Sequence, residues 1–355
     1  MRTDRGLAIL LGLLLPCWLF AAVASAQAID RTPLLPLIGS ERLRLYTLGQ
    51  ALEAQPQSPR HNDAMRQGLE AAAFYHDLPR PAVIGHHLRF SPVLAWDGNI
   101  NGGYLQDRFD LYGLSFDIDP ANRARAGLVF GGRLSGDLRL AWAPGRYLDL
   151  QANAEAAWSP QHRIGRGTAA LSACARNHVS GWTFADVCAT AAAGWRSLSD
   201  SRSTAVSASV AHLFTAGPAF HELTFGIERR QMDEGLQTSV SLGWDAVWSQ
   251  VTTGVSLTLA APIPGETALR HRLSVEVGGM WRNRPVSVSL WHMRSNGGAL
   301  LGMARDDRVG GVGISIQPRR DLSIELVHQV THSSIDLFDE SRTGLNVRFQ
   351  LGRRG

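Results

Sequence analysis

The sequence predicts an all-β protein, a transmembrane antiparallel up-and-down β-barrel of about fourteen strands behind a short N-terminal helical hairpin. Three observations lead there. Apolar and polar residues alternate in short runs from about Leu88 to the end of the chain. The chain begins with an export signal, and no later stretch of about 18 apolar residues could form a spanning helix. Strands can span a membrane only as a closed barrel, because an open sheet edge in lipid leaves backbone groups unpaired.

Two runs show the alternation most clearly. In 345–351, leucine, valine and phenylalanine alternate with asparagine, arginine and glutamine. In 148–158, an apolar set alternates with a polar set, which is Asp149, Gln151, Asn153 and Glu155. A period of two places each set on one face of a strand, so we expect the apolar sets to face lipid and the polar sets to face the interior.

The N-terminus predicts the compartment. Arg2 and Arg5 precede the apolar stretch from Leu7 to Val23, and Ala24-Ser25-Ala26 supplies the small residues of a cleavage site. This pattern is typical of a cleaved signal peptide over 1–26, although an uncleaved anchor helix has a similar core. Together with the strand pattern it predicts the bacterial outer membrane.

Charge restricts the partners. The chain has 35 basic residues, all of them arginine, against 31 acidic ones. The arginines are scattered rather than clustered, and the chain is exported, so we expect no nucleic-acid partner. Arginine binds phosphate bidentately, which suits a surface in contact with outer-membrane lipid and lipopolysaccharide. The sequence indicates no cofactor.

Two cysteines remain after the signal peptide, Cys174 and Cys188, placed symmetrically about Gly181. Turn-forming residues between them indicate a hairpin, and the periplasm is oxidising. We therefore predict a disulfide between them. A metal site would need more ligands than His178 and Asp186 provide at this spacing.

The segment before the barrel lacks alternation. We predict one helix from Ser40 to Ala54, and a second that Asn62 caps. This divides the chain into a signal peptide (1–26), a periplasmic helical segment (27–84) and a barrel (85–355). A lone helical repeat cannot bury its own faces, so the segment must pack on the barrel or on a partner. Leucines such as Leu45, Leu48 and Leu69 could meet a client.

Strand candidates follow one another from Gly85 onward. Tyr112 to Ile118 is one, Asp119-Pro120 reads as a periplasmic turn, and Met293 to Arg308 and Thr331 to Ser341 read as outer loops. Tryptophans near strand ends are typical of the aromatic belts of a barrel. They are Trp96, Trp142, Trp158, Trp281 and Trp291.

The stretch from Phe90 to Gly103, an alternating strand that enters an Asp-x-Asn-x-Asn turn, resembles the first barrel strand of the surface lipoprotein assembly modifier family. The turn residues are Asp97, Asn99 and Asn101. The helical segment is similar to a truncated form of that family's tetratricopeptide part. The resemblance implies an outer-membrane barrel that assists translocation or surface display of lipoproteins or other exported proteins, with a lipoprotein client as partner.

Other interpretations remain open. A turn like Asp97 to Asn101 can open a calcium loop, but Arg108 occupies the position where such a loop has glutamate, so we expect a tight turn and no metal. His332 and Ser334 superficially match a lipid hydrolase, but we do not expect an enzyme. The alternative to export is a passive porin or structural barrel. A barrel of about fourteen strands could enclose an open or a blocked lumen.

Overall fold

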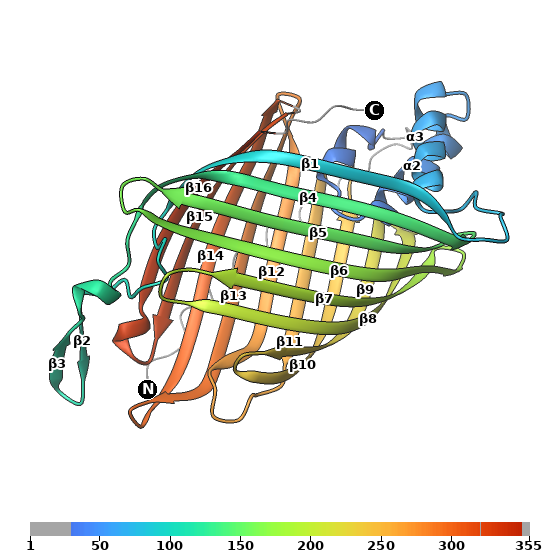
Figure 1. Ribbon diagram of the computed structural model, residues 1–355. Helices are drawn as coiled ribbons and strands as arrows, with labels where there is room; N and C mark the ends of the chain where they lie inside the picture. The colour runs from blue at the N-terminus through green and yellow to red at the C-terminus, as the bar shows by residue number, and fades with distance from the viewer. Residues whose placement is uncertain (1–29, 320, 350–355) are drawn as a thin grey trace. The chain divides into compact units, whose positions relative to one another are not determined.

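A computed structural model describes residues 30–319 and 321–349, so the predicted signal peptide lies outside the described residues. Fourteen antiparallel strands form a closed barrel in which each pairs with its neighbours along the chain, and β1 closes the ring against β16 (Figure 1). The barrel strands are β1 (Ala82–Asp97), β4 (Gly127–Ala143), β5 (Arg146–Ser159), β6 (Ile164–Ser180), β7 (Thr183–Trp195), β8 (Asp200–Ala216), β9 (Ala219–Met232), β10 (Gly235–Val247), β11 (Val251–Ala260), β12 (Ala268–Trp281), β13 (Arg284–Leu300), β14 (Met303–Arg319), β15 (Leu322–Ser333) and β16 (Glu340–Phe349).

The two ends of the barrel differ in their connections. At the end where β1 begins, the strands are joined by short turns, such as 144–145 and 282–283. At the other end lies a long connection from Gly98 to Ala126. Outer-membrane barrels have short periplasmic turns and longer extracellular loops, so β1 begins at the periplasmic side. Among the described residues, no helix is long and apolar enough to cross a membrane.

The outer wall is apolar, as the alternation predicts. Large side chains such as Leu88, Phe225 and Leu290 are exposed along the strands. Trp96, Trp142, Trp158 and Trp281 are exposed near strand ends, where an aromatic belt lies. A closed barrel with this outer wall is an outer-membrane protein.

The prediction for Trp291 was wrong. Strand β13 continues to Leu300, which places Trp291 in the middle of the strand. It pairs with Gly311 on β14, and a Cβ on Gly311 would lie 2.1 Å from the Trp291 ring. The indole therefore lies over the glycine on the inward face.

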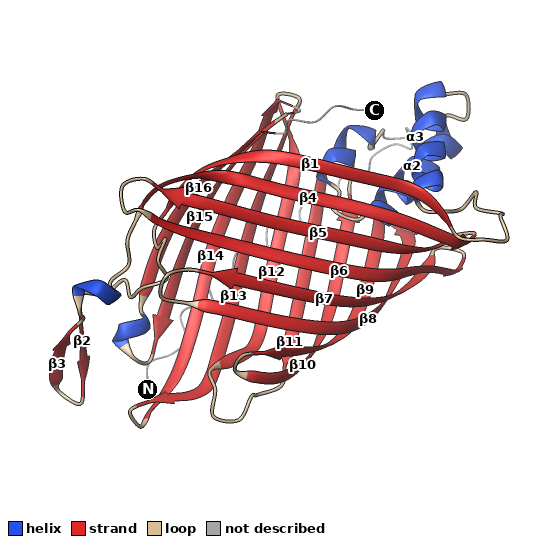
Figure 2. Cartoon of the chain, in the orientation of Figure 1, coloured by secondary structure: helices blue, strands red, loops and turns tan. Residues whose placement is uncertain are grey.

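From residue 30 to the barrel, the structure has three helical elements (Figure 2): η2 (Thr32–Leu37), α2 (Glu41–Ala54) and α3 (Pro59–Ala71). Ser40 caps α2, because its side chain accepts a hydrogen bond from the backbone N–H of Leu43. The prediction that Asn62 caps the second helix was wrong. Pro59 stands at the first position of α3, where a proline costs no hydrogen bond, and Asn62 lies inside the helix.

The structure also corrects one strand assignment, one turn and two outer loops. Residues 112–118 belong to a small hairpin, β2 (Arg108–Leu111) and β3 (Leu114–Asp117), outside the barrel. Asp119 and Pro120 lie in the same extracellular connection, so they form no periplasmic turn. Most of 293–308 is strand, because β13 and β14 continue beyond the apolar zone as a hairpin with its turn near Leu301. Likewise β15 continues to Ser333, which leaves a shorter loop than 331–341.

Candidate functional site

The barrel interior is open to water along part of its wall. Asp245 on β10 and Glu276 on β12 both pair with Gly254 on β11, and both point inward because Trp244 and Val277 beside them point outward. Their side chains are nevertheless exposed, as is that of Arg272 on β12. Charged groups that point into a barrel and stay exposed indicate a hydrated lumen.

The opposite wall carries an arginine network on β1, β4, β5 and β6. The Nε of Arg166 lies 2.8 Å from Oδ2 of Asp97, and its Nη2 lies 3.4 Å from Oε1 of Glu155. Arg133 donates to the same Glu155 carboxylate. Beside them, a cavity of about 240 Å³ lies at the seam between β1 and β16, lined by Arg89, Arg133, Arg166, Arg348 and other residues. This wall therefore carries arginines paired with carboxylates, and it faces Asp245, Arg272 and Glu276 across the lumen.

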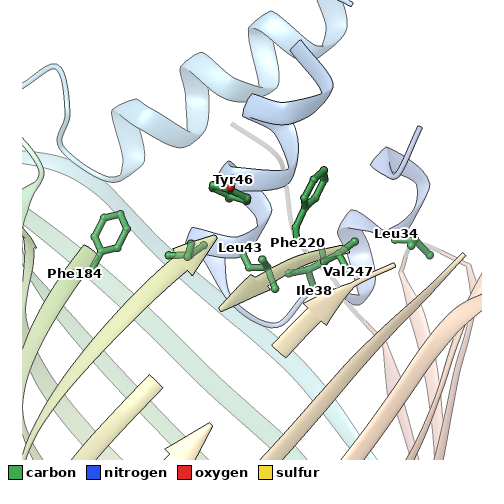
Figure 3. Close-up of a cluster of buried hydrophobic side chains, with 8 residues drawn as sticks. Leu34, Ile38, Leu43, Tyr46, Phe184, Phe220 and Val247 are labelled. Carbon is green, nitrogen blue, oxygen red and sulfur yellow. The ribbon is translucent and has the colours of Figure 1, made fainter. Parts of the chain in front are cut away.

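The helical segment lies in the periplasmic mouth. One buried apolar cluster joins the helical segment to inward side chains at the periplasmic ends of β7 to β10 (Figure 3), and its members from η2, α2 and the link between them are Leu34, Ile38, Leu43 and Tyr46. The barrel members of this cluster are Phe184, Leu213, Phe220 and Val247. The hydrophobic effect therefore holds the segment in the mouth.

The segment crosses the mouth rather than touching one edge of it. Leu37 in η2 lies against β12, where a Cβ on Gly278 would come within 3.3 Å of the leucine. Beyond α3, the carbonyl of Ala73 accepts a hydrogen bond of 3.0 Å from Gly145 in the β4–β5 turn. Phe74 contacts the ring of His178 on β6, with 5.1 Å between ring centroids. The segment is therefore fastened from β12 round to β4.

Ion pairs fix the segment to the lumen wall. Arg42 on α2 pairs with Asp186 on β7, which also accepts a hydrogen bond of 2.7 Å from Arg176 on β6. Glu41 accepts a hydrogen bond of 2.8 Å from Arg139 on β4. Burial alone would raise the pKa of Glu41, but the hydrogen bond and charge of Arg139 outweigh burial and hold that pKa below its ordinary value.

This arrangement contradicts the expectation of an exposed client surface. Leu45 and Leu48 are only 7% and 6% exposed, so neither can meet a client while the segment stays docked. Leu69 is half-buried. A Cβ on Gly68 of α3 would lie 2.3 Å from the side chain of Leu45, which shows how closely the two helices pack.

Asp97, Asn99 and Asn101 form a buried turn at the extracellular end of β1. Asp97 accepts a hydrogen bond of 2.8 Å from the backbone N–H of Asn99. The Asn101 side chain donates to the carbonyl of Arg123 and accepts from the N–H of Arg125. These bonds anchor the long extracellular connection at its two ends. The positive charge of Arg166, which pairs with Asp97, also disfavours the binding of a calcium ion at this turn.

That connection reaches far across the extracellular end. The carbonyl of Asn101 accepts a hydrogen bond of 2.8 Å from Leu198 in the β7–β8 turn. Gln106 donates to the carbonyl of Asp339, between β15 and β16. Tyr112 donates to the carbonyl of Leu301, at the tip of β13 and β14. Both ends of the lumen are thus partly covered by chain.

Cys174 and Cys188 form a disulfide, as predicted. They are direct partners on β6 and β7, and Gly181 lies in the turn that joins these strands. Both cysteines face inward, because Cys174 also pairs with the inward residue Asp149 on β5. The bridge lies two residues from Asp186, which holds the helical segment.

The residues considered for catalysis do not meet. His332 lies at an outward position of β15, whereas the Ser334 hydroxyl donates to the carbonyl of Ala304 and accepts from the N–H of Asp306. Within the part of the chain that the structure describes, no group of three or more His, Cys, Asp or Glu side chains could hold a metal ion.

Sequence reasoning missed the ion pairs between the helical segment and the barrel. Arg42 and Asp186 are 144 residues apart, and nothing local links them. One signal was available. Strand β9 begins Ala-Phe-His-Glu, and Phe220 stands at an inward position where it pairs with Val247 of β10.

No protein-family model matches the chain, and no curated protein matches it, so the resemblance to the surface lipoprotein assembly modifier family stays a prediction. Solved outer-membrane proteins have similar folds at low identity. OpdK of Pseudomonas aeruginosa, solved with vanillate, is 12% identical over 74% of this chain and 98% of its own, with a TM-score of 0.39. OprB of Pseudomonas putida is 6% identical over 75% of this chain and 94% of its own, with a TM-score of 0.44. OccK2 (OpdF) of Pseudomonas aeruginosa, in complex with glucuronate, is 8% identical over 77% of this chain and 99% of its own, with a TM-score of 0.36.

Proposed function

We propose that this protein is a passive channel through which small hydrated solutes cross the outer membrane, with the helical segment narrowing its periplasmic mouth. The observation that supports it is the exposure of Asp245, Arg272 and Glu276, although all three point into a closed barrel. A lumen filled by packed side chains would bury these groups, and their charges would then lack solvation.

The charge distribution suggests the class of solute. Arg89, Arg133 and Arg348 lie around the seam of β1 and β16, whereas Asp245 and Glu276 lie on β10 and β12, across the ring. Arg133 pairs with Glu155 and Arg348 pairs with Glu325, and Arg272 lies on β12 beside the two carboxylates, so a solute in the lumen meets charges of both signs. Such a field favours small polar or zwitterionic solutes over apolar ones.

Lipoprotein translocation is the second interpretation, and it requires a rearrangement of the helical segment. A polypeptide could pass only after the helical segment leaves the mouth and exposes the cluster of Leu43, Tyr46 and Phe220. The channel proposal needs no such step, because small solutes could pass beside a docked segment.

Planar-bilayer recordings test the proposal. We expect the purified protein to give stepwise ion conductance. Replacing Asp245 and Glu276 together by Asn and Gln should shift the reversal potential in a salt gradient toward anion selectivity. Arg272→Gln should shift it toward cations. Val277→Ala, on the lipid side next to Glu276, is the matched control and should change neither. Folded protein that gives no conductance in the bilayer would overturn the channel.

A further inference from the structure

Three carboxylates from neighbouring strands form a row on the lumen wall. Glu222 on β9 pairs with Asp245 on β10, and Asp245 pairs with Gly254 on β11, whose other partner is Glu276 on β12. These three acids, the acidic row, lie at one height. With strands about 4.8 Å apart, the row extends for about 14 Å around the lumen. It lies close to the helical segment, since Leu37 of η2 contacts β12 two residues beyond Glu276.

Two members of the row are open to the lumen. Asp245 and Glu276 are exposed, and both point inward because Trp244 and Val277 beside them point outward. A Cβ on Gly254, between them, would lie 2.8 Å from Oδ1 of Asp245. The carboxylate of Asp245 therefore leans over the glycine toward Glu276, so the two negative charges face the same part of the lumen.

Glu222 is buried at the end of the row, beside Asp245. It is only 5% exposed, and its Oε2 has no hydrogen-bond partner among the described residues. Arg42 of α2 acts on this carboxylate electrostatically, but that guanidinium already pairs with Asp186. A buried charge without a full set of partners is costly, and its field is strong where water is excluded. Glu222 therefore adds a negative potential that a cation bound at the row would offset.

The arginines of this part of the lumen have other partners. Three of them form one network of ion pairs with three other carboxylates, namely Arg42, Arg139 and Arg176 with Glu41, Asp149 and Asp186. Within the described residues, no ion pair joins an arginine to Asp245 or Glu276. Arg272 is four residues from Glu276, about 13 Å along β12. The acidic row therefore has an excess of negative charge.

The shape of the row indicates which cation fits. A metal ion needs ligands gathered around one point, and no group of His, Cys, Asp or Glu side chains in the described part of the chain is arranged to hold one. An extended aliphatic amine can instead place one ammonium group at each exposed carboxylate. Ser256 on β11 and Ser274 on β12 pair with each other on the same inward face, so their hydroxyls can accept further hydrogen bonds from the ammonium groups.

We propose that the acidic row is a binding site for aliphatic amines that carry two or more ammonium groups. One ammonium group contacts Asp245 and the next contacts Glu276, while the buried charge of Glu222 strengthens the attraction. This inference rests on the proposed channel for the entry of the amine, and it names a class of solute that the channel retains at its periplasmic mouth.

Calorimetric titration of the four-carbon diamine putrescine into the detergent-solubilised protein tests the site. Asp245→Asn/Glu276→Gln should bind about tenfold more weakly or worse, because each change removes a charge-assisted hydrogen bond. Glu325→Gln is the matched control, since Glu325 already pairs with Arg348, and it should bind as the wild type does. The shift in gel mobility on heating verifies that each variant is folded.

Gly254→Ala distinguishes a shaped site from general attraction between charges. The substitution leaves every charge in place, but its Cβ would collide with the carboxylate of Asp245 and displace it. We expect severalfold weaker binding of putrescine. Gly243→Ala is the control on the neighbouring strand, because a Cβ there would come no closer than 3.6 Å to Thr224. Equal affinity in both alanine variants would overturn the proposed geometry.

Two further probes identify the ligand chemistry. Butanediol, which has the length of putrescine without its charges, should not bind, and an equal concentration of Mg²⁺ should not displace putrescine. Binding of butanediol, displacement by Mg²⁺, or full affinity in folded Asp245→Asn/Glu276→Gln would each overturn the proposal.

Planar-bilayer recordings separate the site from the channel. Putrescine binding by a protein that gives no conductance would support the site and overturn the channel. Steady conductance in a protein that does not bind putrescine would overturn the site and leave the channel in place.

Discussion

Arg42, in the helix that precedes the barrel, pairs with Asp186 in the middle of the chain, inside the barrel wall. Asp186 is buried and also pairs with Arg176, so a single carboxylate neutralises one cation from the segment and one from the wall. This relationship makes the helical segment part of the lumen. It also suggests how the width of the periplasmic mouth can be tested.

Asp186→Asn should loosen the segment. The change removes the buried countercharge of Arg42 and leaves Arg176 with the more distant carboxylate of Asp149, which is unfavourable. We expect larger and noisier single-channel conductance than in the wild type. Asp63→Asn is the control, because Asp63 forms only an exposed ion pair with Arg66 on α3 and such pairs contribute little. Unchanged conductance in folded Asp186→Asn would show that the segment does not limit flow.

The Glu41–Arg139 contact predicts a dependence on pH. The pKa of Glu41 is lowered in the docked state, so its contribution to docking is complete above the ordinary carboxyl pKa and is lost as pH falls through the lowered one. Conductance should stay constant from pH 7 to about pH 5 and rise below about pH 4. Other carboxylates also titrate there, so the comparison is with Glu41→Gln, which should rise less on acidification. An equal rise in conductance in both proteins would show that other carboxylates, and not Glu41, cause the effect.

An arginine should destabilise the barrel much more on the lipid face of β13 than on its lumen face. Leu290 faces lipid and is exposed, whereas Ser289 beside it pairs with Glu276 on the lumen side. Leu290→Arg should destabilise the barrel by about 2–4 kcal/mol, and Ser289→Arg should cost far less because it enters water. Urea unfolding in lipid vesicles measures both. Similar losses of stability in the two variants would mean that the lumen at this height is not hydrated.

The disulfide should stabilise the β6–β7 hairpin. Replacing Cys174 and Cys188 together by serine should lower the free energy of unfolding by about 3 kcal/mol, because the bridge restricts a loop of this length in the unfolded chain. Thermal unfolding with and without reductant measures the effect. The double variant should match the reduced wild type, and a reduced protein as stable as the oxidised one would contradict the prediction.

The local pattern of the sequence predicted the barrel, a strand number of about fourteen and the disulfide, and the structure confirms them. Alternation depends only on neighbouring residues, and a strand such as β16 shows it regardless of what surrounds it. The same local rules predicted the first helix from Ser40 to Ala54, and the structure has it from Glu41 to Ala54. They were wrong where a segment that looks like a strand lies outside the barrel, as in β2 and β3, because the alternation around Leu114 does not reveal whether it joins the ring.

Only the tertiary structure decided what the interior contains. The helical segment lies in the mouth because Phe220 and Val247 pack with Leu43 and because Arg42 pairs with Asp186. These contacts join residues that are far apart in the chain. Register has the same effect on the outer wall, where His271, Arg294, Arg308 and His332 become neighbours only when four strands pair. A period of two determines which face a residue takes, but the pairing of strands determines which residues it meets.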